Sequence, residues 1–146
     1  EYIDAPEPFI TRCEFVGRRF LYAVRADTSQ GFLLCPADEC QTDDAFCPTT
    51  QAPTSKFTVV KDFDHPILER YQRFIEANGI HIAGIEFILD KDGELYTYDI
   101  NTNTNYNPTA EAEAGLSGMR RIAEYLGDQL AEVAGYRVKA LQVAAS

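Results

Sequence analysis

Residues 84–101 read GIEFILDKDGELYTYDIN, and this stretch decides the fold. Two segments rich in β-branched and aromatic residues, expected as strands over residues 80–89 and 94–101, flank the turn-forming sequence Asp90-Lys91-Asp92-Gly93. This pattern predicts a β-hairpin, in which the two strands pair antiparallel.

The predicted hairpin carries two carboxylates and an amide. Side chains alternate along a strand, so Glu86 shares a face with Gly84 and Ile88, and Asp99 shares a face with Asn101. Folding about the turn brings Glu86 opposite or diagonal to Asp99, and directly opposed side chains lie about 4.5–5.5 Å apart. Two carboxylates at that range repel unless a cation or a proton lies between them.

Carboxylate and amide oxygens are the ligands that magnesium prefers. We therefore predict a metal site formed by Glu86, Asp99 and Asn101. An alternative is that Glu86 is a solvated residue of an edge hairpin, although it stands in an apolar run. An EF-hand loop is a poor fit, because Ile88 would occupy the position where such a loop needs Asp.

Outward from this hairpin, residues 9–25 form two apolar-rich runs around Gly17-Arg18-Arg19, which predicts a second hairpin. Residues 35–55 are rich in Pro, Thr, Asp and Cys and predict a long, mobile polar loop before a strand at residues 57–60.

Two helices complete the expected elements. Asp64 is a good N-cap for the first helix, Pro66 suits its first turn and Asn78-Gly79 ends it. The second helix is expected over residues 117–134. The predicted buried residues of the two helices, chosen by their helical spacing, are Ile67, Tyr71, Phe74 and Ile75, then Met119, Ile122, Ala123, Leu126, Leu130 and Val133. The order of elements predicts an α+β fold, an antiparallel sheet with packed helices.

Composition limits the class of protein. The chain has 146 residues, 45% of them hydrophobic, and a formal net charge of −10. This fits one globular domain over residues 1–146. A chain this acidic is a poor candidate for nucleic-acid or membrane-surface binding, and no apolar run reaches the length of a membrane span. Because the chain opens on Glu1-Tyr2-Ile3, we expect a piece of a longer protein.

The cysteines do not form a recognisable metal motif. Cys35, Cys40 and Cys47 fall in the predicted polar loop, with spacings that do not suit a zinc site, and Cys13 falls in the first hairpin. Free thiols in a reducing cytoplasm are the favoured interpretation, and a disulfide between two of the three loop cysteines stays open.

Taken together, Gly84-Ile85-Glu86 on one strand and Asp99-Ile100-Asn101 on the next resemble the metal-binding end of the ATP-grasp ligases. The resemblance covers nearly the whole chain, but only the C-terminal part of that fold. It implies that Glu86, Asp99 and Asn101 hold the Mg²⁺, or alternatively Mn²⁺, that bridges ATP phosphates.

The N-terminal residues agree with this resemblance. Glu1–Glu7 is similar to the hinge strand of the family, which implies that the backbone near Ile3 faces adenine and that Glu7 takes the ribose hydroxyls. Arg12, with Arg25 a strand later, looks closest to the RimK-type glutamate ligases, where such arginines face phosphate or an acyl-phosphate. Surface solvation is an equal alternative for Arg25.

The sequence also departs from the family pattern. Asp99 stands where the family more often has Glu, and Thr102–Asn107 replaces the expected small-Pro-Gly loop that helps to seat the acceptor. The resemblance implies an ATP-dependent carboxylate–amine ligase that acts through an acyl-phosphate. Its substrates would be small-molecule or peptide acids and amines, and a homo-oligomer stays open. Alternatives are a non-catalytic ATP-grasp-like binding module and a structural interaction domain.

Overall fold

The computed structural model describes residues 3–29 and 56–134. The predicted loop at residues 35–55 and its three cysteines lie outside these residues. The elements are β1 (Phe9–Val16), β2 (Arg19–Asp27), β3 (Phe57–Val60), α1 (Ile67–Ala77), β4 (Ile82–Leu89), β5 (Leu95–Asn101), α2 (Pro108–Ala114) and α3 (Gly118–Ala134).

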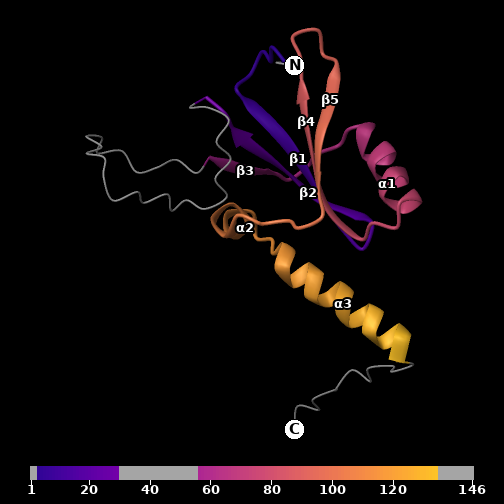
Figure 1. Cartoon of the computed structure of the whole chain (residues 1–146). Helices are drawn as coiled ribbons and strands as arrows, with labels where there is room; N and C mark the ends of the chain where they lie inside the picture. Colours follow the sequence, from indigo (N-terminus) through magenta and orange to yellow (C-terminus); the bar gives the residue numbers. More distant parts are fainter. Residues whose placement is uncertain (1–2, 30–55, 135–146) are drawn as a thin grey trace, which may run out of the picture.

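The five strands form one antiparallel sheet in the order β3-β2-β1-β4-β5. Both predicted hairpins are present, as β1–β2 and β4–β5, and the α+β prediction is confirmed. Figure 1 shows α1 lying against the sheet, while α3 extends away from it beyond the short α2.

The main core lies between the sheet and α1. Its buried side chains come from alternate positions of the central strands and from one side of the helix: Cys13, Phe15, Ala23, Ile67, Tyr71, Ile75, Ala83, Ile85 and Phe87. A smaller cluster of Ile10, Ala26 and Ile88 contains residues of the opposite parity. It therefore lies on the other face of the sheet.

The start of α1 differs from the prediction. Asp64 is not the N-cap: the helix begins at Ile67, after Pro66, and no side chain of the N-cap residue bonds to it. His65 Nδ1 instead accepts a hydrogen bond of 3.1 Å from the Ile67 N–H. With Asp64 as the N-cap the helix would begin at His65, whereas Pro66, with a helical φ of −56°, is the N-cap residue and the helix begins two residues later.

The predicted helix stripes are only partly buried. Ile67, Tyr71 and Ile75 are buried, whereas Phe74 is 41% exposed. On α3 the prediction is wrong for Met119, Leu126 and Leu130, which are exposed, as is Ala123, while Ile122 is half-buried. The side chain of Val133 lies outside the described residues. Helical periodicity identifies an apolar face, but it does not say that this part of the chain covers it.

The contact of α3 with the sheet is local and aromatic. Tyr125 stacks on His81, with ring centroids 5.9 Å apart, and its hydroxyl hydrogen-bonds the ring Nδ1. Arg18, at a φ of +65°, donates to the other ring nitrogen of His81 at 3.0 Å. Since a guanidinium can only donate, Nε2 of His81 is the acceptor of this hydrogen bond.

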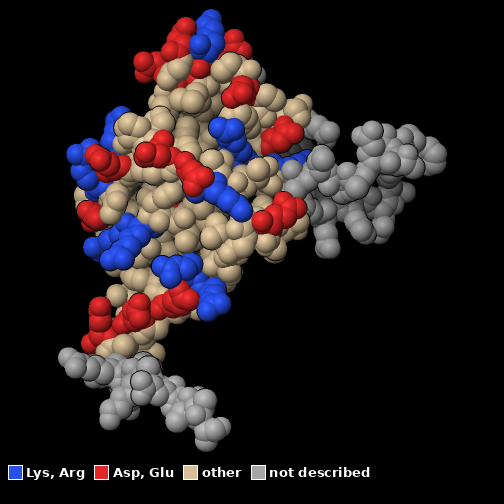
Figure 2. Space-filling view, turned by 180° about the vertical axis from the view of Figure 1, so that it is seen from behind, with Lys and Arg blue, Asp and Glu red and all other residues tan. Residues whose placement is uncertain are grey.

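Charge is mixed on the molecular surface. On the face seen in Figure 2, Lys and Arg side chains lie among Asp and Glu side chains. No helix within residues 3–29 and 56–134 has the length and apolar character needed to cross a membrane.

Candidate functional site

A pocket of about 500 Å³ opens on the face of the sheet opposite α1. Residues of all five strands and of the segment 105–107 line it, and the residue from β3 is Phe57. Its polar residues from the strands are Arg12 and Glu14 of β1, Tyr22 of β2, Glu86 of β4, and Tyr98, Asp99 and Asn101 of β5. The structure therefore brings together four of the seven predicted site residues: Arg12, Glu86, Asp99 and Asn101.

A β-bulge decides which residues of β5 face the pocket. Glu86 pairs with Asp99, but Phe87 pairs with Thr97, so Tyr98 is the extra residue. Thr97 shares a hydrogen bond of 2.6 Å with Tyr71 of α1, on the other face. Tyr98 and Asp99 both line the pocket, because an extra residue shifts the alternation by one. Regular alternation would have put Thr97 on the same face as Asp99.

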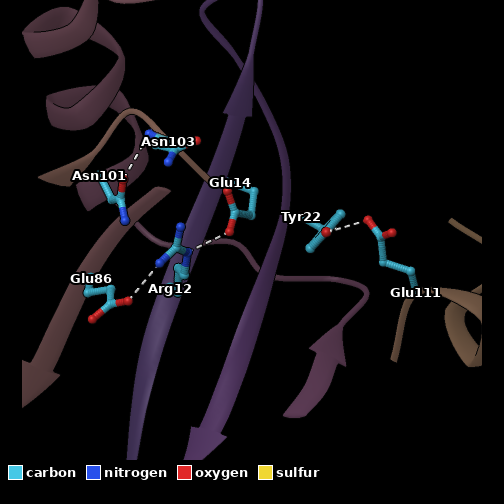
Figure 3. A network of polar contacts seen from close by, with 7 residues as sticks. All are labelled: Arg12, Glu14, Tyr22, Glu86, Asn101, Asn103 and Glu111. Atoms are coloured by element: carbon cyan, nitrogen blue, oxygen red, sulfur yellow. Dashed lines mark hydrogen bonds and ion pairs between the residues drawn. The ribbon is translucent and has the colours of Figure 1, made fainter. Parts of the chain in front are cut away.

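Arg12 forms the centre of the polar network in this pocket. Its Nε donates to Glu14 Oε1 at 2.6 Å and its Nη1 donates to Glu86 Oε1 at 2.9 Å (Figure 3). The guanidinium lies over Gly84, where an added Cβ would stand 2.3 Å from Nη2. A side chain at position 84 would therefore occupy the place of Arg12. The sequence pattern identified Arg12 and Gly84 but did not predict this contact.

Glu14 is the most deeply buried carboxyl of the site, with 2% of the residue exposed. Desolvation raises its pKa to about 7, against the opposing effect of Arg12, and the nearby charges of Glu86 and Glu111 add to the increase. Glu14 Oε2 and Arg12 Nη2 are both buried and have no hydrogen-bond partner. Sequence analysis missed Glu14 as a site residue, and the available signal was a Glu inside the apolar run of β1.

A second buried carboxyl supports one wall of the pocket. Glu111 of α2 accepts hydrogen bonds through Oε1 from the Tyr22 hydroxyl at 2.5 Å and from the Gly118 N–H at 2.6 Å. Burial, followed by the hydrogen bond and charge of Glu111, raises the pKa of Tyr22. Glu111 thus joins β2 to the start of α3, beside the pocket. Helix α2 was not predicted from the sequence, although Asn107-Pro108 and Gly115 are recognisable cap residues, and Asn107 Oδ1 does accept from the Ala110 N–H.

The donor set of Glu86, Asp99 and Asn101 suits a hard cation, because all three present oxygen. Asp99 is exposed at the pocket, whereas Glu86 is buried and already paired with Arg12. Asn101 Oδ1 accepts a hydrogen bond of 2.8 Å from the Asn103 N–H. Among the described residues, His, Cys, Asp and Glu nowhere form a group of three that could hold a metal ion. A site here therefore depends on the amide of Asn101.

The other predicted site residues lie outside the pocket. Arg25 lies on the opposite face of the sheet, with its Cζ 4.4 Å from the centroid of the Phe9 ring. Ile3 packs against the cluster of Ile10, Ala26 and Ile88, and Glu7 is exposed. Phe57 packs against the same cluster and also lines the pocket.

The raised pKa of Glu14 predicts a pH-dependent effect of Glu14→Gln on stability. A carboxyl whose folded pKa is above its unfolded value stabilises the fold at low pH, and this contribution is lost as pH rises through the folded pKa. We expect Gln, which cannot ionise, to be nearly neutral at about pH 5 and stabilising at about pH 8, a change of about 2 kcal/mol between the two.

Urea unfolding of the wild type and of Glu14→Gln at both pH values measures this change, and the difference between the two proteins removes the contribution of all other titrating groups. Equal differences at the two pH values would mean that the Glu14 carboxyl keeps its ordinary pKa.

Comparison with known proteins identifies the fold. No protein-family model and no curated protein matches the sequence. Among solved structures, the ATP-grasp ligase PsnB complexed with a minimal precursor matches with a TM-score of 0.59 and 14% identity over 88% of this chain and 35% of that chain. The macrocyclase MdnC from Microcystis aeruginosa, bound with its precursor peptide MdnA, matches with a TM-score of 0.55 and 14% identity over 84% and 34% of the two chains.

A third structure is an ATP-grasp ligase from Chryseobacterium gregarium, in complex with ADP and a leader and core peptide. It gives a TM-score of 0.52 and 18% identity over 90% of this chain and 34% of that chain. A second PsnB structure holds Mg and ADP. The described fold is thus one that occurs in ATP-grasp ligases. The chain spans about a third of the length of these structures.

Proposed function

We propose that this protein is an ATP-dependent carboxylate–amine ligase, and that residues 1–146 form the C-terminal part of its ATP-grasp domain. The carrying observation is that Glu86, Asp99, Asn101 and Arg12, from three strands, line one pocket. The fold shared with ATP-grasp ligases supports this proposal, as does the presence of Mg and ADP in one of the PsnB structures.

In this proposal Glu86, Asp99 and Asn101 hold Mg²⁺, or Mn²⁺ in its place, against the phosphates of ATP. A divalent ion at such a site neutralises the charge of the transferring phosphoryl group. Asp99 is exposed at the pocket and is available to a ligand, whereas Glu86 would exchange part of its contact with Arg12 for the ion.

Arg12 supplies the positive charge that the acyl-phosphate needs. Its Nη2 has no hydrogen-bond partner, and the ion pairs of Nε and Nη1 hold the guanidinium in place. Preorganised donors of this kind stabilise charge that develops during phosphoryl transfer. Arg25 stays a proposed catalytic residue. Its side chain lies on the opposite face of the sheet, so it would have to move to contact the phosphate. The backbone near Ile3 and the carboxyl of Glu7 are proposed to bind adenine and ribose.

The finer assignment is a RimK-type glutamate ligase with a small-molecule or peptide acid and an amine as substrates. Peptides bound to the structural neighbours agree with a peptide partner. The proposal includes a cytoplasmic location, where a free thiol such as that of Cys13 stays reduced, and leaves a homo-oligomer open.

The test is ADP release by the full-length protein with ATP, Mg²⁺ and hydroxylamine, over a panel of amino acids and short acidic peptides. Hydroxylamine traps an acyl-phosphate as a hydroxamate, so ADP and hydroxamate should appear together with one class of acid. Nucleotide binding without either product would favour the non-catalytic module. No nucleotide binding would favour the structural domain.

A further inference from the structure

Three side-chain atoms of the described pocket-lining residues are buried and have no hydrogen-bond partner: Tyr106 Oη, and Glu14 Oε2 and Arg12 Nη2, whose residues already form an ion pair. Glu14 Oε2 is an acceptor and Arg12 Nη2 is a donor. Their partners in the pair, Oε1 and Nε, are 2.6 Å apart. Leaving a buried polar atom unpaired costs about 1–3 kcal/mol, so an unpaired acceptor and an unpaired donor in the lining of one pocket indicate a ligand.

The charges of the pocket indicate what Glu14 would bind. Glu14, Glu86 and Asp99 line the pocket, and Arg12 is the cationic side chain among the described lining residues. An excess of carboxylates favours a cationic ligand. Glu14 Oε2 can only accept a hydrogen bond when the carboxyl is ionised, so the ligand atom beside it carries a proton.

The neighbouring carboxyl groups of Glu86 and Glu111 already have hydrogen-bond partners. Glu111 Oε1 holds Tyr22 and Gly118, and Glu86 Oε1 holds Arg12. Burial, then the charge of Glu86 and a hydrogen bond with it, raises the pKa of Tyr98, so Glu86 has a second neighbour. Glu14 Oε2 is the carboxyl oxygen that is buried, unpaired and beside Arg12 (Figure 3).

We propose that Glu14 binds the ammonium group of the amine substrate and takes a proton from it. This inference rests on the proposed ligase function. Arg12 Nη2 would hold a phosphoryl oxygen of the acyl-phosphate, and the ion pair between the two side chains keeps the amine beside the carbonyl carbon.

One proton passes from the ammonium to Glu14, and the freed lone pair forms the C–N bond to the carbonyl carbon. The bond between that carbon and the phosphate oxygen breaks, and its electron pair leaves with the phosphate. The phosphate takes the second proton from nitrogen, giving the amide and hydrogen phosphate.

The first test compares two amine probes in the full-length protein, with an acid that yields a hydroxamate. Methylamine is charged at neutral pH and needs a base, whereas hydroxylamine is largely unprotonated. General-base catalysis contributes about 10²–10⁴-fold, so Glu14→Gln should lower the methylamide rate by about 100-fold or more. The hydroxamate rate should fall by less than about threefold, because the amide oxygen of Gln can still accept the hydrogen bond of Arg12 Nε. Glu113→Gln, an exposed change on α2, is the control and should alter neither rate.

Equal losses with both probes, or no loss with methylamine, would overturn the assignment of Glu14. Absence of hydroxamate from the wild type with every acid would instead overturn the ligase proposal.

A second test of Glu14 does not need turnover. In the full-length protein with ¹³C-labelled glutamate, the carboxyl resonance that Glu14→Gln removes should shift and saturate with methylammonium chloride. It should not respond to tetramethylammonium chloride, which has no N–H to donate. No shift with methylammonium, or the same shift with both salts, would show that Glu14 does not bind an ammonium group.

Discussion

Replacing Asp99 by asparagine in the full-length protein should lower ATP turnover by about 100-fold or more, because a metal site supplies several kcal/mol of charge stabilisation and about 1.4 kcal/mol corresponds to tenfold in rate. The fold should be retained. Asp99 is exposed and stands directly opposite Glu86, so the change removes one of two neighbouring carboxylates. The measurement is ADP release at saturating ATP over a range of Mg²⁺ concentrations.

Asp92→Asn is the matched control, because it makes the same chemical change in the exposed turn of the same hairpin. Turnover of Asp92→Asn should equal that of the wild type. Normal turnover of Asp99→Asn would remove Asp99 from the metal site, and loss of its thermal transition would assign it a structural role instead.

The second large effect is expected for Gly84→Ala. An added Cβ would meet Arg12 Nη2 at 2.3 Å and Cζ at 2.5 Å. The guanidinium is the mobile end of a long side chain, so Arg12 would move and the strand would not. Its displacement leaves Glu14 and Glu86 buried without their cation, which we expect to cost about 3 kcal/mol in the free energy of unfolding. Ligase activity should fall by about 100-fold with the loss of a positioned charge.

Gly127→Ala provides the comparison, since a Cβ there meets nothing within 4 Å and the residue lies in α3. Alanine at that position should be neutral or stabilise by up to about 1 kcal/mol. Urea unfolding and ADP release check both variants. If Gly84→Ala has the free energy of unfolding and the ADP release rate of the wild type, the position of Arg12 does not depend on the absence of a side chain at residue 84.

The hairpins were predictable because turn residues and apolar runs are local signals. The pairing of Glu86 with Asp99 followed from the same logic, and the structure has that register. The bulge at Tyr98 was not predictable, since nothing in the residues 94–101 marks where alternation slips. It is what puts Thr97 against Tyr71 and leaves Asp99 at the pocket.

Burial could be predicted less well than secondary structure. Glu14 was not singled out from the sequence, yet it is buried beside Arg12, in a pocket that residues distant in sequence also line. Leu126 and Leu130 show the opposite error: they have helical spacing, yet they are exposed at 54% and 68%. A periodic pattern reports the character of a face, and only the tertiary arrangement decides whether that face is covered.

The bulge also bears on how distant relatives of this hairpin should be recognised. A search pattern with a fixed number of residues between Glu86 and Asn101 includes the bulge residue Tyr98 in that number. The pattern therefore does not reveal that a bulge is present. A relative with a regular strand would present the same acid and amide one position closer in sequence, and an ungapped comparison would align its acid with Tyr98. Alignments across this turn should therefore allow a single-residue gap in β5, placed by the face on which each side chain lies and not by residue identity.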